Sequence, residues 1–256
     1  PDFGGMTLRV GDLNGDGAPD LLVAQSEYGS REIRCLTALT ITGKRLWQTG
    51  SPSPANGRAY SDLPVQIYDW DGDGVNEVLH IRQARYAEPC EYMHGDCRIR
   101  ERANRYEGTA LMVVLDGLSG REKAIIPLPP PADDCIVLVD LTGRGRREDF
   151  VVKDRYWNMW GVSRDGEVLW HWQGATGHYP AVADVDGDGR DEVFVGYALL
   201  DHDGTVIFDH LEKYGIDRLN PSVHSDANAV VRMADGRWRL LFGNHGVHCL
   251  ATDGQE

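Results

Sequence analysis

A short acidic loop that recurs along the chain constrains this sequence more than any other feature. In its clearest copy, Asp184, Asp186 and Asp188 alternate with spacer residues, and Glu192 follows at the ninth position. Oxygen-bearing side chains spaced in this way can surround a hard cation, and Ca²⁺ takes six to eight oxygen ligands. The loop begins like an EF-hand loop, but its last acid comes earlier, and the apolar run Val193–Val195 follows it instead of a helix. We therefore predict a compact cation loop between two β-strands.

The loop occurs again at other places in the chain, twice intact and twice in reduced form. The intact copies supply Asp12, Asn14, Asp16 and Asp20, and then Asp69, Asp71, Asp73 and Glu77. In a further copy that starts at Asp140, Thr142 and Arg144 replace two ligands, so the charge of Arg144 is expected to substitute for the ion. The last copy is reduced to the turn at 233–236. We predict about three Ca²⁺ sites, at the three intact loops, with a structural role.

Each acidic loop belongs to a repeated unit of four predicted strands. Each loop joins two apolar or alternating runs, and a second hairpin follows whose turn contains Gly, such as Asp165-Gly166 or Asp203-Gly204. Asp-Gly between β-branched and aromatic runs indicates a hairpin, and four antiparallel strands that repeat describe a propeller blade. We predict an all-β fold, a β-propeller of four-stranded antiparallel blades. About five units are visible in residues 1–256, as a single domain or a segment of one, and the incomplete last unit favours a segment of a seven- or eight-bladed propeller.

Composition limits the partners and the compartment. The net charge of −14 argues against a nucleic-acid-binding protein, and no apolar run approaches the length of a membrane span. Low-affinity calcium loops favour a secreted or periplasmic protein, which we expect to be a monomer. Of the five cysteines, Cys90 and Cys97 could form a disulfide, and Cys35, Cys135 and Cys249 are expected to be buried thiols.

The acidic loops and their flanking strands resemble the FG-GAP and VCBS-type calcium-binding propeller repeats of integrin α-chains and bacterial extracellular proteins. The stretch Gly177-His178-Tyr179-Pro180 before the Asp184 loop, with His224-Ser225-Asp226-Ala227 one blade later, resembles the catalytic propeller of rhamnogalacturonan lyases of polysaccharide lyase family 11. That resemblance implies an eight-bladed, calcium-bearing enzyme that cleaves an acidic pectin backbone; other propeller lyases act on ulvan. The insertion at 81–108, within the second blade, departs from the family, so we interpret the chain as a related uronate lyase.

Topology separates the loops from the residues suited to catalysis. With strands named A to D in each blade, the acidic A–B loops and the C–D turns share one face, and the D–A and B–C connections lie on the opposite face. The D–A connections carry His178 and His224 at matching places, so the two imidazoles are expected to lie close together. Histidine, tyrosine and arginine concentrate on this opposite face, which we therefore predict to be the active face.

β-Elimination needs a neutralised substrate carboxylate, a base for the C5 proton and an acid for the leaving oxygen. For catalysis we predict His178 and His224 as base or acid, with Tyr156 or Tyr197 as partner. For substrate binding we predict Lys153, Arg155, Asn244, His245, Trp157, Arg82 and Arg85. Among these, Arg155 and Lys153 would grip the carboxylate, and Trp157 would stack on a sugar.

Two alternatives stay open at this point. His178, His224 and His245 could together bind a transition metal such as Zn²⁺. The chain could also be a non-catalytic propeller, integrin-like, that binds carbohydrate or protein and uses calcium only for stability. The gathering of proton-transfer groups on one face favours the enzyme.

Overall fold

The computed structural model describes residues 7–26, 32–56, 63–83, 109–130, 132, 134–154, 157–214, 225, 227–243 and 246–256. Over these ranges the regular secondary structure consists of β-strands. No helix in the described part of the chain is long and apolar enough to cross a membrane.

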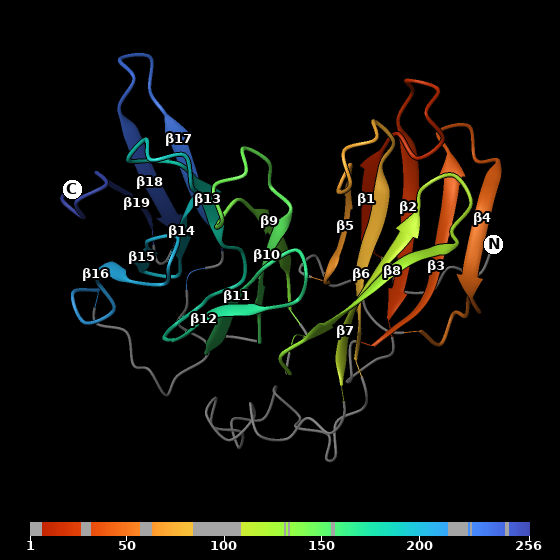
Figure 1. Ribbon diagram of the computed structural model, residues 1–256, viewed down its shortest axis with the longest axis horizontal. Helices are drawn as coiled ribbons and strands as arrows, with labels where there is room; N and C mark the ends of the chain where they lie inside the picture. Colours follow the sequence, from red (N-terminus) through yellow and green to blue (C-terminus); the bar gives the residue numbers. More distant parts are fainter. Residues whose placement is uncertain are drawn as a thin grey trace. The chain divides into compact units, whose positions relative to one another are not determined.

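The described strands form five antiparallel sheets in which sequence neighbours are also hydrogen-bonded neighbours (Figure 1). The first sheet contains β1 (Thr7–Gly11), β2 (Asp20–Ser26), β3 (Ile33–Thr40) and β4 (Arg45–Gly50). The second contains β5 (Val65–Tyr68), β6 (Glu77–Gln83), β7 (Ala110–Asp116) and β8 (Glu122–Leu128). The third contains β9 (Ile136–Val139), β10 (Asp149–Lys153), β11 (Asn158–Val162) and β12 (Val168–Gln173). The fourth contains β13 (Ala181–Ala183), β14 (Glu192–Val195), β15 (Ala198–Leu200) and β16 (Val206–Asp209), and the last contains β17 (Asn228–Arg232), β18 (Trp238–Gly243) and β19 (Val247–Leu250).

This order confirms the predicted four-strand unit. In each of the first four sheets the acidic loop joins the first strand to the second, and a tight turn joins the third to the fourth. Central strands such as β10, β11 and β14 are buried along their whole length, whereas the outer strand β12 exposes most of its side chains. Apolar and β-branched residues fill these central strands because both of their faces are covered.

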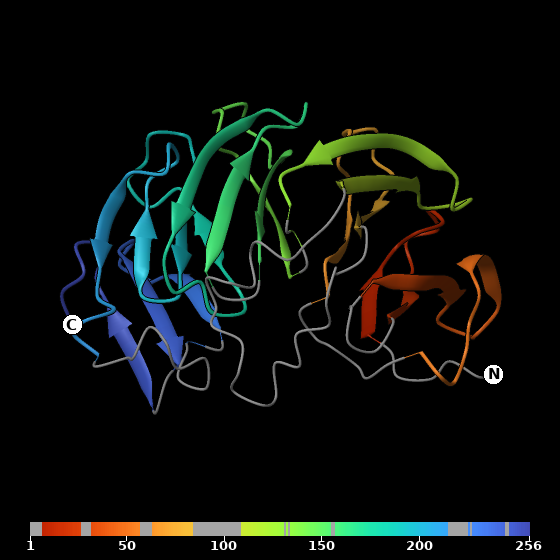
Figure 2. The same cartoon turned by 90° about the horizontal axis from the view of Figure 1, so that it is seen from below.

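The described chain divides into two compact units, the first holding β1–β8 and the second β9–β19. Within the first unit, β1 packs beside β5. Within the second, β13 packs beside β9, and β17 packs beside β13 and β14 (Figure 2). First strands that lie side by side are typical of adjacent propeller blades. The prediction that residues 1–256 form one domain stays a prediction.

Aromatic side chains on fourth strands join neighbouring sheets. Trp47 of β4 donates its indole N–H to Gly117 O at 2.6 Å, and Trp170 of β12 donates to His202 O at 2.8 Å. Both indoles are buried and lie in the hydrophobic clusters between sheets. Each acceptor belongs to the third-to-fourth-strand turn of the next sheet, so these turns help to hold the sheets together.

Candidate functional site

Each intact acidic loop is shaped by its first aspartate. Asp12 Oδ1 accepts a hydrogen bond from Gly15 N at 2.7 Å, and Asp12 Oδ2 accepts one from Gly17 N at 2.8 Å. Asp69 and Asp184 accept the same pair of bonds in their own loops. The glycines at these two places have φ between 74° and 89°, a region that only glycine enters without strain. The Asp and Gly spacing read from the sequence is therefore a backbone requirement as well as a ligand pattern.

The acid that closes each loop is buried and fixed by the main chain. Asp20, Glu77 and Glu192 are each at most 1% exposed. One carboxylate oxygen of each accepts a bond from the backbone N–H of the second loop residue, at 3.0 Å, 2.9 Å and 2.7 Å respectively. Each of these hydrogen bonds therefore joins the start of the acidic loop, just after the first strand, to the first residue of the second strand.

The loop at 184–192 has the features of a cation site. Glu192 Oε1 is buried without a hydrogen-bond partner, and burial raises the pKa of this carboxyl group to about 7. Ligand oxygens of Asp184, Asp186 and Glu192 lie within 4.8 Å of one another. A buried oxygen without a partner is costly, and a divalent cation held by these oxygens would remove that cost. The side chains present therefore fit Ca²⁺, which prefers an all-oxygen shell.

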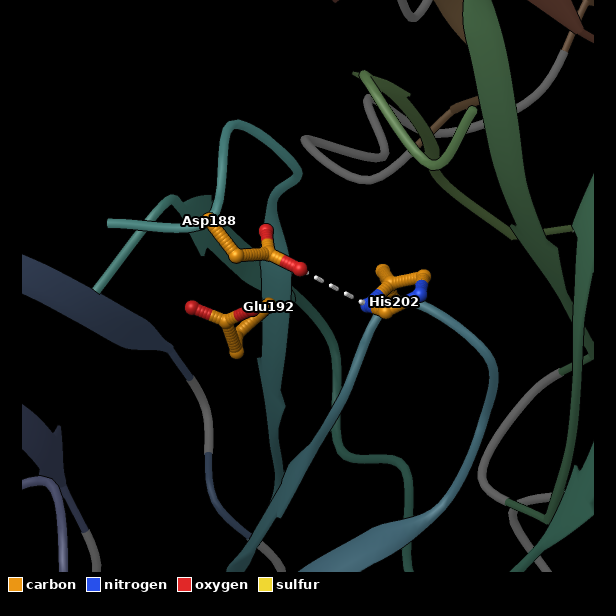
Figure 3. Close-up of side chains that lie close together, drawn as sticks. All are labelled: Asp188, Glu192 and His202. Atoms are coloured by element: carbon orange, nitrogen blue, oxygen red, sulfur yellow. Dashed lines mark ion pairs between the residues drawn. The ribbon is translucent and has the colours of Figure 1, made fainter. Parts of the chain in front are cut away.

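The turn between β15 and β16 brings a histidine to the same loop. His202 Nδ1 lies 2.6 Å from Asp201 Oδ1 and 3.7 Å from Asp188 Oδ2. Figure 3 shows the Asp188 carboxylate directed at the imidazole, with Glu192 close by on the adjoining strand. Asp188, Glu192 and His202 each place one ligand atom within 4.8 Å of the others. This hairpin therefore adds a basic side chain to the edge of the acidic loop.

The loop at 69–77 already contains a positive charge. Lys123 Nζ of β8 lies 2.6 Å from Asp71 Oδ2, 2.7 Å from Glu77 Oε1 and 3.5 Å from Asp73 Oδ2. The hydrogen bonds to Asp71 and Glu77 raise the pKa of the Lys123 ammonium well above its usual range. Three of the four predicted calcium ligands of this loop therefore surround an ammonium group.

The reduced loop at Asp140 is one residue longer than the intact copies. Its closing acid is Asp149, whose Oδ2 accepts bonds from Leu141 N at 3.1 Å and from Thr142 Oγ1 at 2.8 Å. Arg144 does not reach that acid in any bond described; its guanidinium pairs with Glu148 at 2.9 Å, where Arg164 of the next hairpin also pairs at 2.5 Å. Thr142 thus replaces a ligand by bonding the closing acid, while the arginine charge lies beside Glu148.

On the opposite face of the second unit, the connections that enter three successive sheets lie next to one another. His178 N donates to Ser225 O at 3.3 Å, and Asn228 N donates to Tyr179 O at 3.1 Å. Cys135 Sγ donates to His178 O at 3.2 Å. The side chains of His178 and Tyr179 are partly exposed, and their rings are 6.5 Å apart between centroids. The structure therefore places the partly exposed His178 at this edge of the sheets, and its catalytic role stays a prediction.

Lys153 has a different environment from the one that the sequence suggested. It is fully buried, its ammonium is paired with the buried carboxylate of Asp134, and it donates to Asp154 O at 3.0 Å. The prediction that Lys153 grips a substrate carboxylate is wrong, because its charge is already used inside the protein. Lys153 is the last residue of β10, and the sequence alone does not reveal that its side chain turns inward.

Tyr197 and Trp157 are also interior residues. Tyr197 is 1% exposed and packs edge-on against Phe242, with ring centroids 5.3 Å apart. Trp157 is 6% exposed, and its backbone N–H donates to the carboxylate of Asp154 at 2.8 Å. Burial excludes the predicted roles of Tyr197 as a catalytic partner and of Trp157 as a sugar platform. Both residues shape the core beneath the connections instead.

Several predicted residues fall outside the part of the chain that the structure describes. These are His224, Tyr156, Arg155, Asn244, His245 and Arg85, together with most of the 81–108 insertion and both Cys90 and Cys97. Arg82 is described at the end of β6; it is exposed and pairs with Glu122 at 3.0 Å. The predictions for this group stay predictions.

The thiols follow the prediction in two cases of three. Cys35 and Cys135 are buried, whereas Cys249 is exposed. Cys249 lies on β19, the outer strand of the last sheet, so one of its sides has no neighbouring strand in that sheet. The apolar run around it looked like a core strand, and its place at the sheet edge corrects that expectation.

Comparison with known proteins supports the resemblance found in the sequence. Residues 12–80 match the model of the FG-GAP-like repeat family. The chain is similar to rhamnogalacturonan exolyase YesX of Bacillus subtilis (strain 168), with 23% identity over 92% of this chain and 47% of the relative. It is similar to the same organism's rhamnogalacturonan endolyase YesW, with 23% identity over 86% of this chain and 44% of the relative. The chain thus spans about half the length of the curated relatives that it matches.

A solved structure extends this likeness to the fold. The Bacillus licheniformis rhamnogalacturonan lyase PL11 superposes with a TM-score of 0.65 at 20% identity, over 97% of this chain and 48% of that chain. The resemblance to FG-GAP-type repeats and to family 11 lyases is therefore confirmed, as is the all-β propeller fold class.

Proposed function

We propose that this chain is the part of a polysaccharide lyase that cleaves rhamnogalacturonan, or a closely related uronate-containing polysaccharide, by β-elimination. The observation that carries the proposal is the match to two rhamnogalacturonan lyases over most of this chain. The partly exposed His178, on the face away from the acidic loops, also supports the proposal, because an imidazole can act as a general acid or base. A module that only binds has no need of a proton-transfer group there.

β-Elimination needs a base, an acid and a group that neutralises the substrate carboxylate. A base removes the C5 proton of the uronate, the C4–O bond breaks, a C4=C5 double bond forms, and an acid protonates the leaving oxygen. We assign the proton transfers to His178 and His224; the hydrogen bond from His178 N to Ser225 O, the residue after His224, supports their pairing. Arg155 and the arginines of the insertion remain the candidates for the substrate carboxylate, because Lys153 is committed to Asp134.

We also infer that the loops at 12–20 and 184–192 bind Ca²⁺ in a structural role and that the protein is a secreted or periplasmic monomer. The unpartnered Glu192 Oε1 supports a cation at the second of these loops. A calcium-rich compartment is the setting in which low-affinity loops of this kind stay occupied.

The assignment of His178 is tested with the intact protein that contains this chain. His178→Ala should lower the rate of product formation from rhamnogalacturonan by at least 10²-fold, the usual effect of removing a general acid or base. His171→Gln is the matched control: His171 is exposed and stacks on Trp160 at 4.9 Å, so its loss should leave the rate unchanged. Equal rates for wild type and His178→Ala, with both folded by circular dichroism, would overturn the assignment.

A further inference from the structure

The acidic loop at 69–77 differs from the other intact loops in what surrounds its carboxylates. The Lys123 ammonium lies within hydrogen-bonding distance of Asp71 and Glu77 and within 3.5 Å of Asp73. Glu77 is fully buried, and its other oxygen accepts the Trp70 N–H at 2.9 Å. Both oxygens of the closing acid therefore have partners, in contrast to Glu192, whose Oε1 has none.

The position of Lys123 is one that other sheets fill with apolar side chains. In each of the first four sheets, the first paired residue of the fourth strand lies opposite an equivalent residue of the third strand. These pairs are Leu39 with Arg45, Leu115 with Glu122, Val162 with Val168 and Leu200 with Val206. The next residue is Lys123 in the second sheet, and Leu46, Leu169 and Ile207 in the others. At this position, a long basic side chain is thus peculiar to the second sheet among these four.

An ammonium and a calcium ion compete for the same oxygens. Ca²⁺ must approach its ligands to 2.3–2.6 Å and needs six to eight of them, whereas Lys123 Nζ already holds oxygens of Asp71 and Glu77 at 2.6 Å and 2.7 Å. Metal binding would require the ammonium to leave the site and expose itself to water. The lysine is covalently attached, so it is always present at high local concentration, whatever the calcium concentration.

We propose that Lys123 is the built-in cation of the 69–77 loop, so that this loop folds without metal, while the 184–192 loop takes a divalent cation. This inference goes beyond the proposed lyase activity and does not depend on it. It changes the predicted set of three calcium sites, since the residues Asp69, Asp71, Asp73 and Glu77 then form an ion-pair cluster in place of a metal site.

The test counts Ca²⁺ bound per chain, by native mass spectrometry of the full chain at saturating CaCl₂. In the wild-type background, Asp73→Asn should leave the count unchanged, whereas Glu192→Gln, which neutralises the closing acid of the other loop, should lower it by one. Lys123→Met keeps the length of the side chain but removes the charge, so the count should rise by one. Adding Asp73→Asn to Lys123→Met should return the count to the wild-type value.

The outcomes separate cleanly. A wild-type count that falls by one with Asp73→Asn, or a Lys123→Met count that stays equal to wild type, would overturn the proposal. If Lys123→Met does not fold, the wild-type and Asp73→Asn pair decides the question alone. Lyase activity is not measured, so failure of the catalytic proposal leaves this result unaffected, and the Glu192→Gln arm reports separately on calcium at the 184–192 loop.

Discussion

The ion pair between Lys153 and Asp134 is the clearest example of a charge that serves structure. Both side chains have no exposed surface, so removal of one partner leaves a buried charge. We expect Asp134→Ala to lower the free energy of unfolding by about 3–5 kcal/mol, measured by urea denaturation. Asp235→Ala, which breaks the exposed pair with Arg237, should cause no measurable change. Equal effects of the two substitutions would contradict the structural role of Lys153.

His80 should make stability depend on pH. Burial lowers its pKa to about 4 from an ordinary value of 6.5, so the unfolded chain binds the proton more readily than the folded one. The stability that neutral His80 provides is present above pH 6.5 and is lost as the pH falls towards 4. Between pH 7 and pH 5, wild type should lose up to about 2 kcal/mol more than His80→Gln, measured by denaturant unfolding at both pH values. Parallel losses in the two proteins would exclude this contribution.

At the scale of residues, the sequence predicted the acidic loops well because ligand spacing and glycine conformation are local. Asp184 and its two glycines form hydrogen bonds across five residues or fewer, so the pattern alone determines the turn. Other features depend on tertiary packing. Lys153 and Tyr197 are buried, and Lys123 binds Glu77, which lies 46 residues earlier in the chain. Lys123 could have been noticed only by aligning the fourth strands with one another, where it replaces leucine or isoleucine.

At the scale of elements, two of the turns between third and fourth strands connect neighbouring sheets, because each packs on a tryptophan of the preceding sheet. A Cβ at Gly204 would lie 2.7 Å from Cγ of Trp170, and one at Gly120 would lie 2.6 Å from Cδ2 of Trp47. The glycine therefore allows the backbone of one turn to lie on the indole of the preceding sheet. The Asp-Gly signal predicted the hairpins, but not that their glycines also make room for a tryptophan.

Two glycines separate these effects experimentally. Gly204 and Gly236 have nearly the same φ, 83° and 84°, but a Cβ at Gly236 would meet no atom within 4 Å. Gly236→Ala should cost about 1 kcal/mol for the backbone conformation alone. Gly204→Ala should cost about 1–3 kcal/mol more because of the clash with Trp170. Equal losses in urea denaturation would show that the turn does not rest on the indole.

At the scale of the whole molecule, basic side chains from third-to-fourth-strand hairpins meet the acidic loops of their own sheets. Lys123, Arg164 and His202 lie at the second, third and fourth sheets. These pairs show that side chains neutralise part of the acidic charge in three of the loops, and under our proposal a divalent cation does so at the 184–192 loop. The division of the faces, which the sequence predicted from strand order, follows because these hairpins and loops contact one another.

Removal of divalent cations should destabilise the protein through the 184–192 loop. At a calcium concentration 100 times the dissociation constant, a bound ion adds about 2.7 kcal/mol to stability. EDTA should therefore lower the melting temperature of wild type in calorimetry. The decrease should be smaller for Glu192→Gln, which lacks the carboxylate whose Oε1 is buried without a hydrogen-bond partner. The same decrease in both proteins would place the calcium effect elsewhere.

The central claim is that the intact protein cleaves an acidic polysaccharide by elimination, and the product itself is the most direct test. Elimination leaves a C4=C5 double bond conjugated to the carboxylate, which absorbs in the ultraviolet, whereas hydrolysis leaves none. Incubation of the intact protein with rhamnogalacturonan should give an absorbance that rises together with the number of new chain ends. New chain ends without absorbance, or neither signal from folded protein on rhamnogalacturonan and related polyuronates, would contradict the claim.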